Sequence, residues 1–214
     1  METTREGTDS LFEAIYTQRA IRRWKPDPVP PELITRVIEA ATKAPSGSNQ
    51  QPWRFVVVTD AARRAAISTA LQTWLQSDSA TREYFESGAK SDDPSVRKML
   101  SGALSLAENL SQAPVFIFPC MYGGQRSDRL LTGSSIYPAV QNLMLAARGL
   151  GLGTVLTTFQ ARIEDDVRRE LALPEDARPV ALIPLGYPDA NFGPTRRKPV
   201  ETVLYWEQWG VEGG

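Results

Sequence analysis

Histidine is absent from this 214-residue sequence, and its absence excludes more chemistry than any other feature of the composition. Without imidazole there can be no Ser-His-Asp or Cys-His nucleophile, no histidine acid–base catalysis, and few of the ligand sets that bind zinc. No metal site is therefore expected. If the chain is an enzyme, we expect a cofactor, rather than a catalytic side chain, to carry the reaction.

Cysteine is almost absent as well. Cys120 is the single cysteine, so an intrachain disulfide is excluded, and this usage is typical of a reducing compartment. The residue ends the apolar run Val-Phe-Ile-Phe-Pro-Cys, and no imidazole is available to activate its thiol. A buried packing role is expected for Cys120 rather than a nucleophilic one.

The sequence also lacks long apolar runs and an excess of either charge. No run approaches the length that spans a bilayer, and the polar, acidic first ten residues do not resemble a signal peptide. The 24 basic residues nearly cancel the 25 acidic ones, which gives no electrostatic reason to expect nucleic acid or an anionic membrane as a partner. We expect a cytoplasmic protein without either partner.

The residues that are present predict helices and strands in irregular alternation around one sheet. Apolar runs rich in β-branched and aromatic residues predict buried strands, and apolar positions at helical spacing predict helices. No repeat or domain boundary is evident, so we expect one domain over residues 1–214, of the α+β or α/β class. The expected strands are residues 53–59, 114–119, 153–158 and 180–187, and the expected helices begin near residues 10, 31, 60, 99, 134 and 163.

Local signals support several of these elements. Ser10 and Glu13 have the spacing of a capping box, Pro31 suits a first helical turn, and Asp60 can cap the helix that follows it. Residues 76–98 are polar and weakly patterned, which predicts a mobile excursion of helix and loop. That excursion and the polar loop at residues 122–132 could shape a substrate pocket or could be solvated connections.

Three arginines, Arg19, Arg22 and Arg23, lie within five positions at the end of the first predicted helix. They could favour the negative end of the helix dipole. They could also form an anion site, because the rigid fork of arginine suits phosphate. Taken alone, the segment favours the dipole interpretation.

Two further segments are rich in turn-forming residues. Residues 45–53 (Pro-Ser-Gly-Ser-Asn-Gln-Gln-Pro-Trp) predict a turn, which could also present backbone N–H groups and amides to a ring system. The glycines at 149, 151 and 153 follow a predicted helix and enter a strand, which is the reverse of the dinucleotide-binding fingerprint. We therefore expect them to end the helix and allow a tight turn.

Together these segments resemble the FMN-dependent nitroreductase family. The resemblance rests on Arg-Ala-Ile-Arg at 19–22, a proline-rich linker, Ala-Pro-Ser-Gly-Ser-Asn at 44–49, and Gln-Pro-Trp at 51–53 before a valine-rich strand. It continues in the glycine-rich turn before Thr157 and Thr158, in Leu-Gly-Tyr-Pro at 185–188, and in Pro-Thr-Arg-Arg-Lys-Pro at 194–199. The match spans residues 11–209 in separate blocks, which is more specific than any one motif.

The resemblance implies an α+β, nitroreductase-like fold with a central, mostly antiparallel sheet flanked by helices. It implies a homodimer in which the C-terminal arm, residues 188–214, reaches the partner subunit, while residues 1–9 are expected to be flexible. The aromatic residues Tyr205, Trp206 and Trp209 could anchor that arm on the partner or could pack on the chain's own core.

The resemblance also implies the residues of an FMN site. Arg19, Arg22 and Arg197 would hold the phosphate and the neighbouring ribityl hydroxyls. The remaining contacts are divided among three segments: Pro45, Ser46 and Asn49 would approach the ring from the partner subunit, Tyr137 and Pro138 would line its face or edge, and Thr157 and Thr158 would lie near the nitrogen that accepts hydride. Where the family has Arg-Arg-Ser, this chain has Gln18, Arg19 and Ala20, so contacts from Gln18 and Ala20 are in doubt.

The implied reaction is a ping-pong cycle in which NADH or NADPH reduces FMN and leaves, and a nitroaromatic, quinone or related acceptor is then reduced. No catalytic side chain is required, which suits a chain without histidine. A site for the extra phosphate of NADPH could use Arg63, Arg64, Arg82, Arg126 or Arg129, although each is also typical of an ordinary surface charge. The alternatives are a flavin store or sensor with little turnover, and an interaction protein that shares only the fold.

Overall fold

The computed structural model describes residues 7–8, 10–123 and 129–211. Its sheet has the strand order β1-β2-β5-β3, with β4 also paired to β2, and every pair is antiparallel. The expected α+β fold with a mostly antiparallel sheet is therefore confirmed. The strands are β1 Trp53–Val58, β2 Val115–Tyr122, β3 Gly153–Thr154, β4 Ala177–Pro179 and β5 Ile183–Gly186.

The central strand β2 divides the core into two layers. Its side chains alternate between the two faces, as the period of a β-strand requires. Val115, Ile117 and Met121 join one apolar cluster, and Phe116 and Phe118 join the other. Because both faces are covered, nearly the whole strand is buried and its sequence reads as one apolar run.

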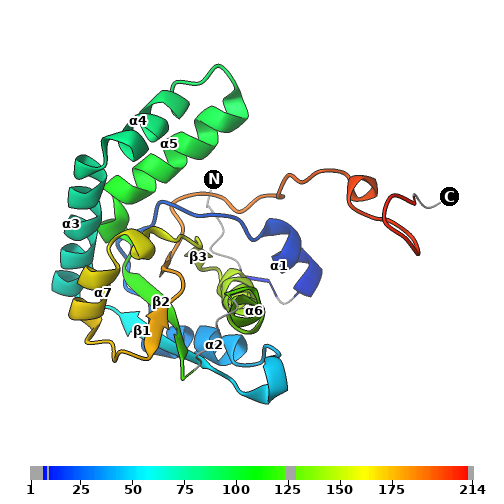
Figure 1. Cartoon of the computed structure of the whole chain (residues 1–214), viewed down its shortest axis with the longest axis horizontal. Coiled ribbons are helices and arrows are strands. Elements are labelled where there is room, and N and C mark those ends of the chain that lie inside the picture. Colours follow the sequence, from blue (N-terminus) through cyan, green and yellow to red (C-terminus); the bar gives the residue numbers. More distant parts are fainter. Residues whose placement is uncertain (1–6, 9, 124–128, 212–214) are drawn as a thin grey trace.

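Helices cover both faces of the sheet, as Figure 1 shows. α2 and α6 pack with one cluster of the core, and α3, α5 and α7 pack with the other. The helices α4 and α5 extend from this second layer as a pair (Figure 1). The helices are α1 Leu11–Thr17, α2 Pro31–Ala41, α3 Ala61–Ser77, α4 Ser79–Gly88, α5 Pro94–Glu108, α6 Arg129–Gly149 and α7 Glu164–Leu171.

The helix boundaries follow the predicted local signals in most places. The Ser10 side chain accepts from Glu13 N, and the Asp60 side chain accepts from Arg63 N at 2.8 Å, so both caps are confirmed. Gly149 ends α6, and Gly151 has a φ of 73°, which confirms the tight turn. The helix predicted from residue 99 begins earlier, at Pro94, because Asp93 caps it.

Five sequence-based expectations were wrong in detail. The helix predicted from residue 134 begins at Arg129, inside the segment that was predicted as a loop at residues 122–132. Residues 76–98 form the end of α3, all of α4 and the start of α5, with little loop between them. The strand at residues 53–59 is only half-buried, because β1 lies at the edge of the sheet and exposes Arg54 and Val57. The strand from residue 153 is interrupted after Thr154 and resumes as a single bridge between Thr157 and Leu182. The short strand β4 was missed.

The C-terminal segment leaves the body of the protein. Figure 1 shows it running past α1 and then away from every other element. Trp209 is 90% exposed and Trp206 is 54% exposed, so the interpretation that these two side chains pack on the chain's own core is wrong. Of the expected flexible residues 1–9, all but 7 and 8 lie outside the described part of the chain. None of the described helices is both long enough and apolar enough to cross a membrane.

Candidate functional site

The arginine segment, residues 18–24, lies along the edge strand β3. Ile21 N donates to Thr154 O at 2.9 Å, and Trp24 Nε1 donates to Gly153 O at 3.0 Å. Ile21 and Trp24 are buried, so they fix the two ends of the short stretch that carries Arg22. A Cβ atom at Gly153 would lie 2.7 Å from the Ile21 side chain, so only glycine allows the segment to lie this close.

Arg19 and Arg22 form an unneutralised pair of cations. Burial lowers the pKa of Arg22, and the positive charge of Arg19 lowers it further. The Nε of Arg22 is buried and has no hydrogen-bond partner, and the described part of the chain offers neither arginine a carboxylate. An unsatisfied donor beside a second cation is costly unless an anion binds there.

The dipole interpretation of these arginines was wrong. α1 ends at Thr17, and its last turn contains no basic residue, so Arg19 and Arg22 lie beyond the helix. Gln18 and Ala20, whose contacts were in doubt, add no positive charge beside Arg19 and Arg22. The Gln18 amide lies 3.8 Å from Met144 Sδ on α6, and Ala20 is exposed.

The segment that carries Arg197 passes close to this pair. Thr195 N and its Oγ1 both donate to Tyr16 O, at 2.9 and 3.2 Å, and a Cβ atom at Gly193 would lie 3.6 Å from Arg19 Nη1. The Arg197 side chain itself is exposed and, within the described part of the chain, donates only to Arg196 O. The segment that carries Arg197 therefore lies beside Arg19, but the Arg197 guanidinium does not contact those of Arg19 and Arg22.

The turn predicted at residues 45–53 is confirmed up to Pro52, since Trp53 begins β1, and its backbone is unusual. Ser48, Asn49 and Gln51 all have positive φ, a conformation that non-glycine residues rarely adopt and that clusters at functional sites. Ser46 Oγ accepts from Gln51 N at 3.0 Å, which closes the turn. Pro45 and Asn49 are exposed, so they are open to a ligand or a partner.

The turn is attached to the part of α6 that carries Tyr137 and Pro138. Gly47 N donates to the buried Ser135 Oγ at 3.2 Å. Tyr137 is exposed, and its hydroxyl lies 3.5 Å from Val180 O, at the long limit of a hydrogen bond. The two segments predicted to contact the flavin ring are therefore neighbours within one chain.

Thr157 and Thr158 differ in their surroundings. Thr157 is buried, pairs through its backbone with Leu182, and accepts from Phe159 N at 3.3 Å through Oγ1. Thr158 is exposed at the start of a short 3-10 helix, Phe159–Arg162. Of the pair, Thr158 has the side chain that is open to a ligand.

Within one chain the predicted residues form two groups instead of one site. Figure 1 places α1, which leads into the arginine segment, on one side of α6, and the loop between α2 and β1, which contains residues 45–51, on the opposite side. No contact in the described part of the chain joins the turn to Arg19 or Arg22.

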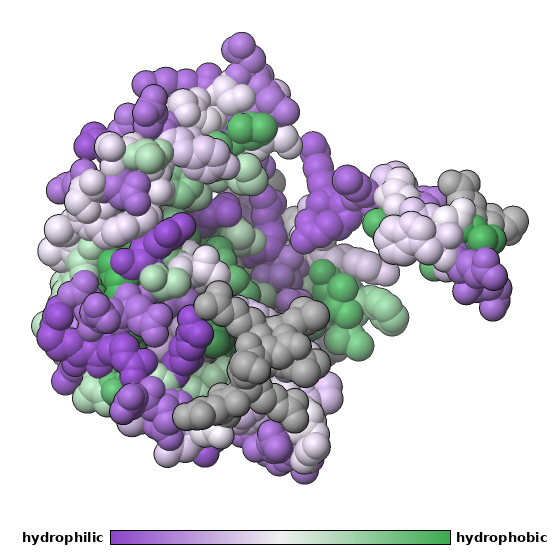
Figure 2. Space-filling view, in the orientation of Figure 1, coloured by the Kyte–Doolittle hydropathy of each residue, from purple (hydrophilic) through white to green (hydrophobic). Residues whose placement is uncertain are grey.

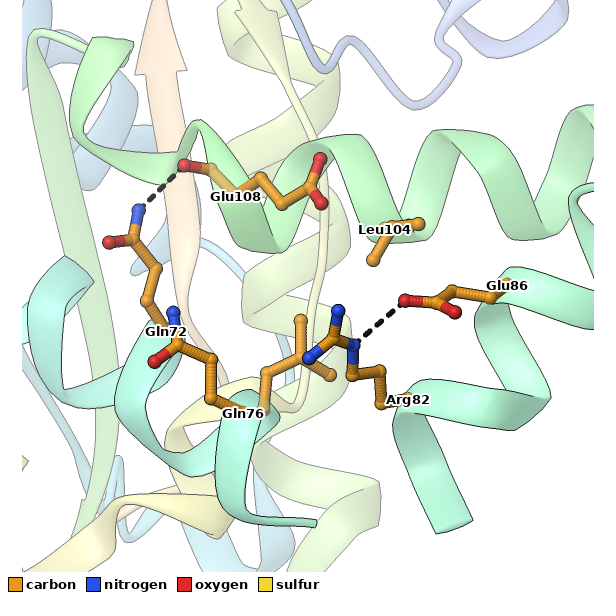
Figure 3. A pocket seen from close by; sticks show the side chains of 7 residues that line it. Gln72, Gln76, Arg82, Glu86, Leu104 and Glu108 are labelled. Carbon is orange, nitrogen blue, oxygen red and sulfur yellow. Dashed lines mark hydrogen bonds and ion pairs between the residues drawn. The ribbon is translucent and has the colours of Figure 1, made fainter. Parts of the chain in front are cut away.

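A separate small pocket lies between α3, α4 and α5, as Figure 3 shows. Its volume is about 230 Å³, and Arg82, a candidate for the extra phosphate of NADPH, is the one predicted residue that lines it. Arg82 and Glu86 pair across its edge at 2.8 Å, and Gln72 donates to Glu108 O at 2.6 Å. The one arginine that lines the pocket is thus already paired with a carboxylate.

Three of the arginines that could bind the extra phosphate of NADPH are described, and each already contacts another group within the chain. Arg63 donates to Glu170 O, Arg64 donates to Ser111 O and Ala113 O, and Arg82 pairs with Glu86. Arg126 and the side chain of Arg129 lie outside the described part of the chain. No binding site for a second phosphate is assembled from the first three.

Two buried polar residues were missed by sequence reasoning. Arg148, in the last turn of α6, is 5% exposed and binds the Glu13 and Thr17 side chains. Gln160 is also buried, and its Oε1 has no hydrogen-bond partner. For Arg148, the signal in the sequence was a single charged residue within the apolar pattern of residues 136–152. Such a residue is easily interpreted as an ordinary cation at the C-terminal end of a helix.

Comparison with known proteins agrees with this architecture. The family model described as Nitroreductase family matches residues 15–187. The chain is 32% identical over 212 residues to NADH dehydrogenase from Thermus thermophilus, covering 96% of this chain and 100% of the relative. It is 31% identical over 206 residues to nitrobenzene nitroreductase from Ectopseudomonas oleovorans, covering 85% and 88% of the two chains.

A solved structure extends the likeness to three dimensions. Oxidised iodotyrosine deiodinase bound to FMN and 3-iodo-L-tyrosine aligns with a TM-score of 0.71 at 22% identity, over 94% of this chain and 100% of that one. At this identity the alignment shows a shared fold. With the family model covering most of the chain and a full-length relative above 30% identity, the chain belongs to the nitroreductase family.

Proposed function

We propose that this protein is an FMN-dependent oxidoreductase that passes hydride from NADH or NADPH to a nitroaromatic, quinone or related acceptor in a ping-pong cycle. The observation that carries the proposal is the buried, unsatisfied Nε of Arg22 beside the Arg19 guanidinium. This pair has the chemistry that a phosphate monoester satisfies, because arginine donates charge-assisted hydrogen bonds to phosphate oxygens. Relatives named as a dehydrogenase and a nitroreductase support the reaction class.

Three arginines would hold the FMN phosphate in this proposal. Arg22 would donate from its unsatisfied Nε, and Arg19 would add the second positive charge. Arg197 would complete the set, because its segment is already fixed beside α1 through Thr195 and Tyr16. Neutralising the arginine pair would remove their mutual repulsion, so phosphate binding is expected to stabilise the fold as well.

The ring of the flavin would be held by the second group of residues. FMN supplies hydride transfer when it is bound, and the chain's own residues position and enclose it. The strained turn would present Pro45, Ser46 and Asn49, with Tyr137 and Pro138 beside it in the first half of α6. Thr158, which follows β3 beside the arginine segment, would offer an exposed hydroxyl near the reactive edge from the other group of residues, while the Thr157 side chain would fix the local backbone.

Because the two groups lie on opposite sides of α6, the proposal requires a homodimer with shared sites. Exposed apolar side chains on α1 (Leu11, Phe12, Ile15 and Tyr16) fit such an interface. Figure 2 shows apolar colour gathered where α1 projects. A large exposed apolar surface of this kind marks an interaction site.

The C-terminal arm has a suitable receiving surface on the partner subunit. A groove of about 500 Å³ runs between α1, α2 and α6, with Leu11, Leu145 and Leu150 among its apolar residues. Arg36 and Lys43 also line it, whereas the arm carries Glu201 and Glu207 among its apolar side chains. The apolar side chains and the two carboxylates of residues 200–211 are complementary to the groove, so we propose that this part of the arm of one subunit occupies the groove of the other.

The first experiment records the visible spectrum of the purified protein and then adds NADH or NADPH without oxygen. A flavin spectrum that bleaches, and returns when a quinone or nitroaromatic is added, supports the cycle and identifies the donor. Bleaching that no acceptor reverses would favour a flavin store or sensor. A colourless protein that fails to bind added FMN contradicts the proposal.

The second experiment tests the phosphate site directly. The double variant Arg22→Met and Arg197→Met should lose affinity for FMN, because two of the three proposed phosphate ligands are gone. Arg23→Met with Arg196→Met is the matched control, since both of these arginines are exposed neighbours of the tested ones. Unchanged FMN affinity in the first double variant would exclude the assignment.

A further inference from the structure

Arg148 occupies the junction of three segments that are far apart in the sequence. It lies in the last turn of α6 and is 5% exposed. Its Nε donates to Thr17 Oγ1 at 2.8 Å, and its Nη2 pairs with Glu13 Oε1 at 3.1 Å, both on α1. Its Cζ also lies 4.2 Å from the centre of the Phe192 ring, in the C-terminal segment. One side chain thus joins the ends of two helices and the start of the tail.

α1 has few other means of staying in place. Ala14 is its only buried residue, and its large apolar side chains are exposed. The apolar burial that usually fixes a helix on its neighbour is therefore small here. The buried guanidinium of Arg148 instead holds α1 through directional hydrogen bonds. Its partners Thr17 and Glu13 both lie on the face of α1 that meets α6.

The two segments that Arg148 holds are the ones that carry the proposed phosphate ligands. Arg19 follows Thr17 by two residues, and Arg197 follows Phe192 by five. Between these points the tail is also fixed to α1, through Thr195 and Tyr16. Any shift of α1 or of Phe192 relative to α6 would move Arg19 and Arg197 relative to Arg22, which is anchored separately on β3.

We propose that Arg148 is a positioning residue for the phosphate site: it fixes the end of α1 and the start of the tail on α6, and so sets the spacing of Arg19, Arg22 and Arg197. The proposal rests on the proposed FMN-dependent function. Arg148 is not a ligand in this account, because its guanidinium is already enclosed by Glu13, Thr17 and Phe192.

The test compares FMN with riboflavin, which has the same ring but lacks the phosphate. Dissociation constants for both are measured on flavin-free protein by quenching of flavin fluorescence. Arg148→Met should weaken FMN binding by about tenfold or more and leave riboflavin binding unchanged. A loss of this size is typical when a residue that orients the direct ligands of a site is mutated. Arg148→Lys should recover part of the loss, since it keeps the charge but not the fork.

Two milder variants keep the test decisive if Arg148→Met fails to fold. Thr17→Val removes the acceptor with little change of shape, and Phe192→Leu removes the ring but stays apolar. Each should weaken FMN binding selectively. Arg64→Met is the matched control, because Arg64 also ties separate segments together, through Ser111 O and Ala113 O, but away from this site.

The outcomes separate the two proposals. If the unmodified protein binds no FMN, the proposed function fails, and this inference fails with it. If the unmodified protein binds FMN and the Arg148, Thr17 and Phe192 variants bind it equally well, only the positioning role is overturned. An equal loss of FMN and riboflavin affinity also overturns it, because that result indicates a general effect on folding.

Discussion

Cys120 illustrates at the residue scale how the surroundings of a side chain decide its chemistry. It is fully buried in β2, and its Sγ lies 3.5 Å from Phe118 O. Burial raises the pKa of its thiol from about 9 to about 11. The nucleophile in thiol chemistry is the thiolate, so this cysteine is expected to be unreactive in the folded protein.

The raised pKa of Cys120 predicts a loss of stability at high pH. Between about pH 9 and about pH 11 the unfolded chain releases the thiol proton while the folded chain keeps it, so the unfolded state is favoured as pH rises. The contribution is on the order of 2 kcal/mol, since one pKa unit corresponds to about 1.4 kcal/mol. Urea denaturation of the unmodified protein and of Cys120→Ala across this range would measure it.

The comparison with Cys120→Ala isolates the thiol from the lysines and tyrosines that also titrate at high pH. Below pH 9 the alanine variant should be the less stable of the two, because it leaves a cavity. The difference in the free energy of unfolding between the two proteins should then shrink as pH rises. A difference that stays constant from pH 8 to pH 11 would contradict the assigned pKa.

Single residues of the candidate site were predictable to different degrees. Arg19, Arg22 and the Pro45–Asn49 turn could be selected because they lie in short, ordered motifs. Arg148 could not, because its role depends on Glu13 and Phe192, which come near it only in the folded chain. Local sequence carries information about local geometry, whereas an ion pair between distant segments is a property of tertiary packing.

At the scale of single elements, the helix starts that carry a recognisable capping residue were predicted better than the extents of the strands. A capping side chain lies within three residues of the backbone groups that it binds, so Ser10 and Asp60 could be recognised directly. The extent of a strand depends on what pairs with it. β4 has three residues and ends at Pro179, and its pairing with β2 has no local signal.

The Asp60 cap predicts a measurable effect on α3. Asp60→Ala removes the acceptor for Arg63 N and should lower the free energy of unfolding by about 1 kcal/mol. Asp60→Asn keeps a capping oxygen and should lose much less. Thermal unfolding followed by circular dichroism would compare the three proteins. Equal losses in the two variants would show that the charge, instead of the cap, is what stabilises this helix start.

At the scale of the whole molecule, the layered α+β arrangement was predictable, but the shape of the surface was not. The alternation of β2 between two apolar clusters follows from the period of a strand and the length of the apolar run. The separation of the two groups of site residues by α6 depends on how the helices cross the sheet, which no spacing in the sequence encodes.

The arm and the groove predict a dimer that depends on residues 200–211. The unmodified protein should sediment as a dimer and melt at a temperature that rises with protein concentration. Trp206→Ala with Trp209→Ala should weaken association, because aromatic residues carry much of the binding energy of an interface. Sedimentation equilibrium would measure the dissociation constant.

Trp74→Phe is the control for that double variant, because Trp74 lies in α3 and packs against the chain's own core. It should lower thermal stability and leave the dissociation constant of the dimer unchanged. A monomer in the unmodified protein at all concentrations would contradict both the dimer and the shared site.

The close approach of the arginine segment to β3 also determines which mutations the protein tolerates. Gly153 and Gly186 face each other across β3 and β5, and an added methyl group would collide with Ile21 in one case and with Pro114 in the other. In a library of random substitutions screened for bound flavin, substitutions of Gly153 should therefore reduce flavin binding as substitutions of Arg22 do. The reason is that a side chain at position 153 displaces Ile21, and with it Arg22. A residue without a side chain would rank among the determinants of cofactor binding.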